Sequence, residues 1–189
     1  MSPENLLAPT YVQMLTALSA WLRKAEAQLQ GGDAADLPAA RLAPDMFPLA
    51  TQIRFACVQA LEGVSRLRNK EFPPAVQVLL DEGRGAGDNP GTIADAQTRI
   101  GEALTFLQAL PDVDPDTDAR QTIAHTIPNG MIFDLTAEQY ARDWAIAQFY
   151  FHVMTAYAIL RSRGVDLGKA DYIAHMFTYL RPETMPQAE

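Results

Sequence analysis

His152 is the residue whose type and surroundings are best suited to chemistry. It lies in a segment, 137–163, that contains no glycine or proline and is apolar on nearly every side. A helix of this kind is typically enclosed by neighbours all round. Gln148 and Thr155 share its face with His152, with small residues beside them. We therefore expect a polar pocket at His152, Gln148 and Thr155 that binds a small molecule or a partner.

The same histidine also suits a structural role. A buried imidazole is usually paired with a backbone group or another side chain, because an unpaired buried polar group costs about 1–3 kcal/mol. A neutral buried imidazole would also respond to pH. Residue types alone leave both interpretations open.

Arg41 and Asp45 are the other two candidate binding residues, and they lie just before a predicted helix. Asp45 is suited to cap that helix, because aspartate is among the preferred N-cap residues. An Arg41–Asp45 ion pair would fix the loop in front of the helix. The same two side chains could instead belong to a binding site.

A metal site would have to combine histidine with carboxylates. The candidates are Asp45 and His152 with one of Glu62, Glu138 or Asp143. A catalytic zinc usually has three protein ligands and a water. No such set stands out in the spacing, so the sequence predicts no metal; a metal-dependent enzyme is the alternative.

Composition limits the class of protein. The 189 residues suit a single domain, 1–189, and the net charge of −8 argues against nucleic acid and anionic membrane surfaces as partners. No apolar run is long enough to span a bilayer, and the N-terminus does not resemble a signal peptide. A single Cys57 fits a reducing compartment. We expect a cytoplasmic protein.

Apolar periodicity predicts the elements that position these residues. Helices are expected over 10–29, 45–68, 93–107 and 137–163, with shorter ones over 75–82 and 169–180. Residues 69–91 otherwise read as a long loop that covers a site or is mobile. Asn129-Gly130 between two apolar runs, 122–127 and 131–135, predicts a β-hairpin. A capping box, Thr136 with Gln139, should begin the last long helix.

Four long helices predict an all-α four-helix bundle with a small hairpin before the last long helix. That helix has more apolar surface than one bundle core can bury, so we expect a homodimer formed through it. Tyr157 and Arg161, on the face opposite His152, are candidates for this interface or for core packing.

Two segments resemble a known family. They are RLAPDMFPL at 41–49, and the stretch from Phe151-His152-Val153 through Ala156-Tyr157 to Leu167-Gly168-Lys169 and Asp171-Tyr172. They are similar to a bacterial family of unknown function that is grouped with the DinB/YfiT-like proposed metalloenzymes. The resemblance implies a DinB-like four-helix bundle, commonly dimeric. In the wider superfamily it implies zinc or nickel held by three histidines, one from the second long helix and two from the last, and thiol transfer or hydrolysis.

The chain departs from this ligand pattern. Residues 45–68 contain no histidine, and four residues after His152 stands Ala156. The resemblance therefore supports the fold more than the chemistry. We expect a metal-free DinB-like dimer that binds a small molecule or partner near His152, with a metal-dependent enzyme or a purely structural protein as alternatives.

Overall fold

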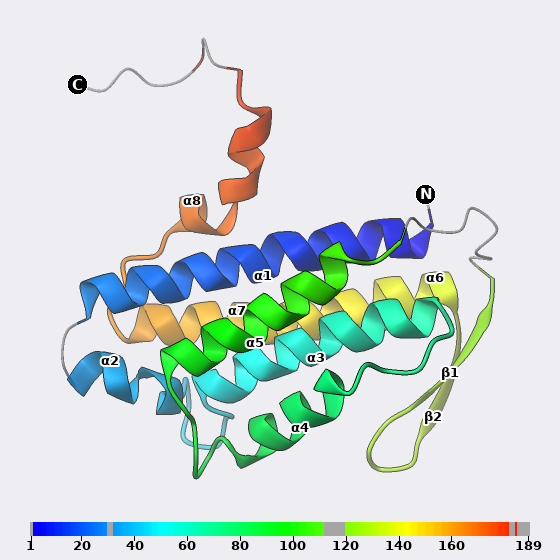
Figure 1. Cartoon of the computed structure of the whole chain (residues 1–189), viewed down its shortest axis with the longest axis horizontal. Coiled ribbons are helices and arrows are strands. Elements are labelled where there is room, and N and C mark those ends of the chain that lie inside the picture. The colour runs from blue at the N-terminus through cyan, green and yellow to red at the C-terminus, as the bar shows by residue number, and fades with distance from the viewer. Residues whose placement is uncertain (1, 30–31, 112–119, 182–183, 185–189) are drawn as a thin grey trace.

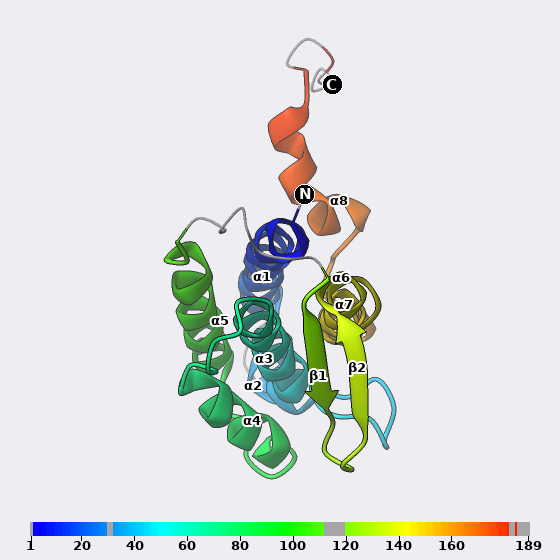
Figure 2. The same ribbon diagram turned by 90° about the vertical axis from the view of Figure 1, so that its right-hand side faces the viewer.

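A computed structural model describes residues 2–29, 32–111, 120–181 and 184 of the chain. Its long helices α1, α3, α5 and α7 lie side by side, which confirms the predicted all-α four-helix bundle (Figures 1 and 2). The other elements are the short α2 and α4, a two-stranded hairpin before α6, and a C-terminal segment that stands away from the bundle. The bounds are α1 Pro3–Gln28, α2 Gly32–Asp36, α3 Leu49–Leu67, α4 Ala75–Gly85, α5 Ile93–Gln108, β1 Thr122–Thr126, β2 Ile132–Thr136, α6 Ala137–Gln139, α7 Ile146–Ser162 and α8 Lys169–Tyr172.

The core lies between the four long helices, each of which contributes one buried stripe. These stripes include Leu15, Leu18 and Leu22 of α1, Ile53, Leu61 and Val64 of α3, Ile100 and Leu107 of α5, and Phe149, Val153 and Leu160 of α7. A large apolar side chain that becomes fully buried contributes about 1.5–3 kcal/mol. Packing of these stripes therefore holds the bundle together.

The first helix begins earlier than its apolar pattern predicts, at Pro3 rather than near Thr10. Ser2 caps it by accepting a hydrogen bond from the backbone N–H of Asn5, and Pro9 lies inside the helix. Proline suits the first turn of a helix but is usually excluded from its interior. The early turns are held by Glu4, which is buried and forms an ion pair with Arg68.

The second long helix begins later than predicted. Pro48, not Asp45, is the N-cap of α3, and no side chain caps this end. Residues before it form a turn closed by the Met46 N–H and the Ala43 carbonyl, while the Leu49 N–H bonds to the Ala40 carbonyl. These backbone bonds hold the approach to the helix, and Asp45 is left exposed.

The region between α3 and α5 is more ordered than the sequence indicates. The predicted short helix is present as α4 and continues through Gly83 to Gly85. Thr51 of α3 donates a buried hydrogen bond of 2.7 Å to the Gly83 carbonyl. A Cβ added to Gly83 would lie 2.5 Å from a ring carbon of Phe55. The missing side chain thus lets α4 pack closely against α3.

The last long helix contains a change of helical type. Its capping box is confirmed, since Thr136 and Gln139 exchange side-chain-to-backbone hydrogen bonds. Residues Tyr140–Ala145 then form a π-helix, here called η2, before α7 begins. The Ile146 N–H bonds to the Ala141 carbonyl, five residues back. The predicted continuous α-helix is therefore interrupted near its start.

The tail forms two short pieces in place of the single helix predicted over 169–180. After α8, residues Ala174–Tyr179 are a 3₁₀-helix. The indole N–H of Trp21 donates to the Asp171 carbonyl at 3.1 Å. In a continuous α-helix this carbonyl would accept from the backbone N–H four residues later. Tyr157 also packs against Trp21, with ring centroids 5.3 Å apart, so it contributes to packing within the chain.

No helix in the part of the chain that the structure describes is long and apolar enough to cross a membrane.

Candidate functional site

His152 of α7 is buried and has a hydrogen-bond partner. Its Nδ1 lies 2.9 Å from Oε1 of Gln52, a buried residue of α3. The Gln52 amide N–H₂ in turn donates to the Phe47 carbonyl at 3.2 Å. Because an amide oxygen only accepts, Nδ1 of His152 carries the proton in this arrangement. The histidine therefore cross-links α7, α3 and the loop before α3.

Aromatic rings enclose the same histidine. The rings of Phe55 and Phe151 lie 5.4 Å and 5.3 Å from the imidazole, each edge-on. Burial lowers the pKa of His152 to about 4, because the charged imidazolium loses its hydration there. His152 is consequently neutral at physiological pH.

Gln148 and Thr155 lie on α7 one turn either side of His152. The Thr155 hydroxyl donates to the Phe151 carbonyl of its own helix at 2.6 Å, so its hydrogen already has an acceptor. Gln148 is half-buried. His152 lines none of the four cavities described for this chain.

Arg41 and Asp45 do not form the ion pair that the sequence suggests. The Arg41 guanidinium donates to the Met46 carbonyl, while the Asp45 side chain is exposed. The next carbonyl of this loop, that of Phe47, accepts a hydrogen bond from Gln52, which pairs with His152. Arg41 therefore holds the loop that contacts the Gln52–His152 pair.

The residues around His152 do not fit a three-histidine metal site. The side chain of α3 that meets His152 is the amide of Gln52, and Ala156 follows one turn later on α7. Within the described residues, no three His, Cys, Asp or Glu side chains are grouped so that they could hold a metal ion. The other carboxylates considered for a metal, Asp45, Glu62, Glu138 and Asp143, are likewise not grouped with His152 in that way.

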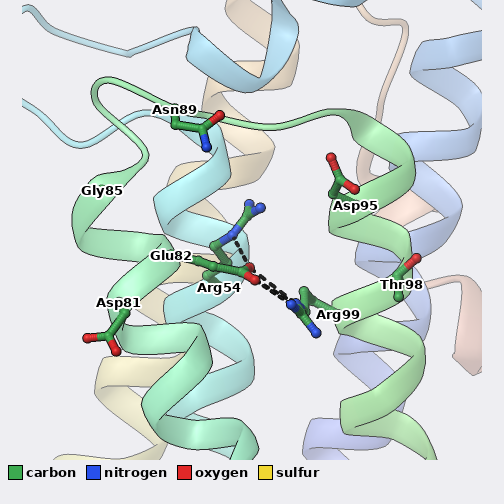
Figure 3. A pocket seen from close by; sticks show the side chains of 8 residues that line it. All are labelled: Arg54, Asp81, Glu82, Gly85, Asn89, Asp95, Thr98 and Arg99. Atoms are coloured by element: carbon green, nitrogen blue, oxygen red, sulfur yellow. Dashed lines mark hydrogen bonds and ion pairs between the residues drawn. The ribbon is translucent and has the colours of Figure 1, made fainter.

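A cavity lined largely by charged side chains is formed by α3, α4 and α5. Arg54, Glu82 and Arg99 meet at its centre, as Figure 3 shows. Arg54 Nε lies 2.9 Å from the Glu82 carboxylate, and Arg99 also pairs with that carboxylate. The two arginines lower the pKa of Glu82 through hydrogen bonds, most strongly from Arg99. These charges already satisfy one another, and their evident role is to fasten α4 to its neighbours.

A second cavity lies beneath the hairpin and has a volume of about 420 Å³. We call it the hairpin cavity. It is formed by α3, α4, β1 with the turn after it, and η2, at the end of the bundle where the hairpin lies (Figures 1 and 2). Its lining residues are Val58, Gln59, Glu62, Arg66, Leu80, Arg84, His125, Thr126, Ile127, Pro128 and Trp144.

His125 is the most unusual residue of the hairpin cavity. It points inward from β1, whose residues alternate between exposed and buried, and it is only 4% exposed. Neither of its ring nitrogens has a hydrogen-bond partner among the described residues. Its ring lies 4.4 Å from that of Trp144 and 5.5 Å from that of Tyr140. Two buried, unpaired polar atoms are costly, and they call for an explanation such as a bound water, ion or ligand.

Three charged side chains line the hairpin cavity without an ion pair among the described residues. They are Glu62 and Arg66 of α3 and Arg84 of α4. The Nε of Arg66 is buried and finds no hydrogen-bond partner within the described ranges, although its guanidinium lies 4.8 Å from the centre of the Phe72 ring. Burial raises the pKa of Glu62, an effect that the two arginines oppose. Burial also lowers the pKa of His125 to about 4, with a smaller contribution from Arg66.

The π-helix places Trp144 in this cavity. A π-turn inserts one residue relative to an α-helix, so it changes which side chains face the bundle. Such turns occur frequently at functional sites. In η2, Tyr140 faces the core with 1% exposure, while Trp144 lines the hairpin cavity.

Sequence reasoning did not identify the hairpin cavity as a site, because its residues come from four separate elements. One signal was present: His125 occupies an inward position of a strand, between Ile123 and Ile127. A polar residue on an otherwise apolar strand face is uncommon. Periodicity could not show that Glu62, Arg66 and Arg84 lie beside it.

Comparison with known proteins gives a family and a fold. A model of a domain of unknown function, DUF1993, matches residues 5–173. A crystal structure of a DinB family member protein from Shewanella denitrificans is 31% identical, with a TM-score of 0.72, and the match covers 97% of this chain and 95% of that one. Among curated proteins no relative matches. The chain belongs to the DUF1993 family, and its four-helix bundle is DinB-like.

Proposed function

We propose that this protein binds a small molecule in the hairpin cavity. The observation that carries the proposal is His125, a nearly inaccessible imidazole whose two nitrogens are unpartnered at the wall of that cavity. Leaving such atoms unsatisfied costs about 1–3 kcal/mol. Because neither nitrogen is accessible in this conformation, a ligand pairs with them only when the imidazole or the hairpin shifts, and that pairing recovers part of the cost. The cavity also lies within the size range of small-molecule sites.

The proposal places the binding site away from His152. That histidine has Gln52 as a partner and is packed between two phenylalanine rings, which favours a structural role. The charges of the hairpin cavity, by contrast, have no ion-pair partner among the described residues. A site near His152 is the competing prediction, and one experiment separates the two.

The chain contains three histidines, so their ring protons can be followed individually by NMR. Spectra of His125→Phe and His152→Phe would assign the signals. We expect a mixed set of small cations, neutral molecules and anions to contain compounds that shift the His125 signals and leave those of His152 unchanged. Shifts confined to the His152 signals would show that the binding site lies beside His152 on α7 instead. A set that shifts neither would contradict a binding function in the hairpin cavity.

We further propose a homodimer formed through α7. Phe151 and Met154 are 57% and 38% exposed on one face of this helix, and Phe47 beside it is 52% exposed. Phe47 contacts Phe55, with ring centroids 5.9 Å apart, so these rings continue the aromatic surface around His152. Large apolar side chains grouped in this way favour contact with a second copy. The dimer and the hairpin cavity are independent proposals.

A further inference from the structure

The charges of the hairpin cavity are unbalanced. Arg66 and Arg84 contribute two positive charges and Glu62 one negative charge, which leaves an excess of one positive charge. The three side chains form no ion pairs within the described residues, although the charges of both arginines act on Glu62 and oppose the rise of its pKa that burial causes. A ligand with one negative charge would neutralise the cavity. Guanidinium groups bind carboxylates particularly well, because both partners are planar and form two parallel hydrogen bonds.

The remaining wall of the cavity is largely apolar and includes an aromatic ring. Trp144 is half-buried there, and Val58, Leu80 and Pro128 lie around it. The indole is fixed in place, since it contacts both His125 and Phe133, whose ring lies 5.6 Å away. A fixed indole favours a flat ring, which stacks or meets it edge-on at little entropic cost. A free inorganic anion would leave this part of the cavity unused.

The imidazole of His125 adds a polar group apart from the guanidiniums. A neutral imidazole presents one donor and one acceptor. Both nitrogens are buried and unpartnered, and Glu62 provides a further acceptor. A hydroxyl or amino group on the ligand would pair with Glu62, or with the imidazole once its ring turns toward the cavity.

We infer that the ligand of the hairpin cavity is a small aromatic carboxylic acid with a hydroxyl or amino substituent. Its carboxylate lies between Arg66 and Arg84, its ring lies against Trp144, and its substituent pairs with His125 or Glu62. This assignment rests on the proposed function, because it specifies which class of molecule binds at the same site.

Four compounds separate the contributions of charge, ring and substituent. They are 4-hydroxybenzoate, benzoate, neutral benzamide and inorganic phosphate, each titrated to millimolar concentration while the His125 NMR signals are followed. We expect 4-hydroxybenzoate to bind most tightly and benzoate next. Benzamide should bind about tenfold more weakly than benzoate, and phosphate should leave His125 unchanged.

Arg84→Gln tests the role of the guanidiniums in a variant that should fold normally, because Arg84 is exposed and has no ion-pair partner. We expect it to raise the Kd for benzoate about tenfold, which corresponds to about 1.4 kcal/mol, and to leave the Kd for benzamide unchanged. Arg163→Gln is the matched control. It removes the same charge from an exposed residue just after α7, away from the hairpin, and should leave both values unchanged.

The outcomes distinguish the ligand class from the proposed function. Equal affinity for benzamide and benzoate, a phosphate response at His125, or unchanged benzoate binding in Arg84→Gln would overturn the carboxylic acid and leave a binding site for another class. No response to any of the four compounds would also overturn it. The broader mixed set then decides independently whether the cavity binds small molecules.

Discussion

At the scale of single residues, two buried histidines have opposite surroundings. His152 has a partner in Gln52, whereas the nitrogens of His125 have none among the residues that the structure describes. The pKa of each is lowered to about 4, chiefly because burial removes the hydration of the charged form. The first residue is thus explained by packing, while the polar atoms of the second find no partner in the part of the chain that the structure describes.

The two histidines make stability depend on pH. An unfolded histidine has a pKa near 6.5 and the folded ones titrate at about 4, so between these values the unfolded state binds more protons. Stability is therefore present above about pH 6.5 and is lost as the pH falls toward 4. Each histidine should lower the free energy of unfolding by on the order of 2 kcal/mol between about pH 7 and pH 5.

Urea denaturation at these two pH values measures the effect. His125→Phe keeps an aromatic ring against Trp144 and cannot be protonated, so its unfolding free energy should change less between them. A variant with the same pH dependence as the native protein would show that His125 is not held neutral by burial.

At the scale of elements, α4 depends on its close approach to α3. Gly83→Ala would place a methyl group against Phe55, whose ring is confined by Phe47 and His152. We expect a loss of about 1–3 kcal/mol of stability, as is typical of overpacking. Gly85→Ala is the control in the same helix, because nothing lies within 4 Å of its added Cβ.

The midpoint of thermal or urea unfolding compares the two glycine variants. Gly85→Ala should be neutral or slightly stabilising, since alanine loses less backbone entropy on folding than glycine. Equal effects of the two substitutions would show that α4 does not pack on α3 as closely as described.

The elements also show which parts of the fold could be predicted from the sequence. Apolar periodicity predicted the four long helices, the hairpin and the Thr136 capping box, because these are local patterns. The pattern placed the start of α1 too late, because the first turns are held by an ion pair between Glu4 and Arg68. It placed the start of α3 too early, because backbone hydrogen bonds hold the preceding residues in a turn. It also missed η2, since a π-turn has no distinct periodicity. The hairpin cavity depends on contacts between distant elements, which no local pattern contains.

At the scale of the whole molecule, the proposed homodimer depends on the exposed face of α7. Phe151→Glu places a charge at the centre of this face on a side chain that is 57% exposed, so the monomer should fold. We expect the charge to weaken dimerisation by at least about tenfold, because an unpaired charge is disfavoured in an apolar interface. Sedimentation at several protein concentrations measures this.

Met131→Glu is the control for the dimer. Met131 has a similar exposure of 52% but lies in the hairpin turn, away from α7. It should leave the sedimentation profile unchanged. A native protein that sediments as a monomer, or a Phe151→Glu variant that dimerises normally, would contradict an interface on α7.

The most direct test of the central claim is a crystal structure of the protein soaked with 4-hydroxybenzoate. We predict density for the compound in the hairpin cavity, within hydrogen-bonding distance of His125 or Arg66 and against Trp144. Density beside His152, or a hairpin cavity closed by its own side chains, would contradict the account.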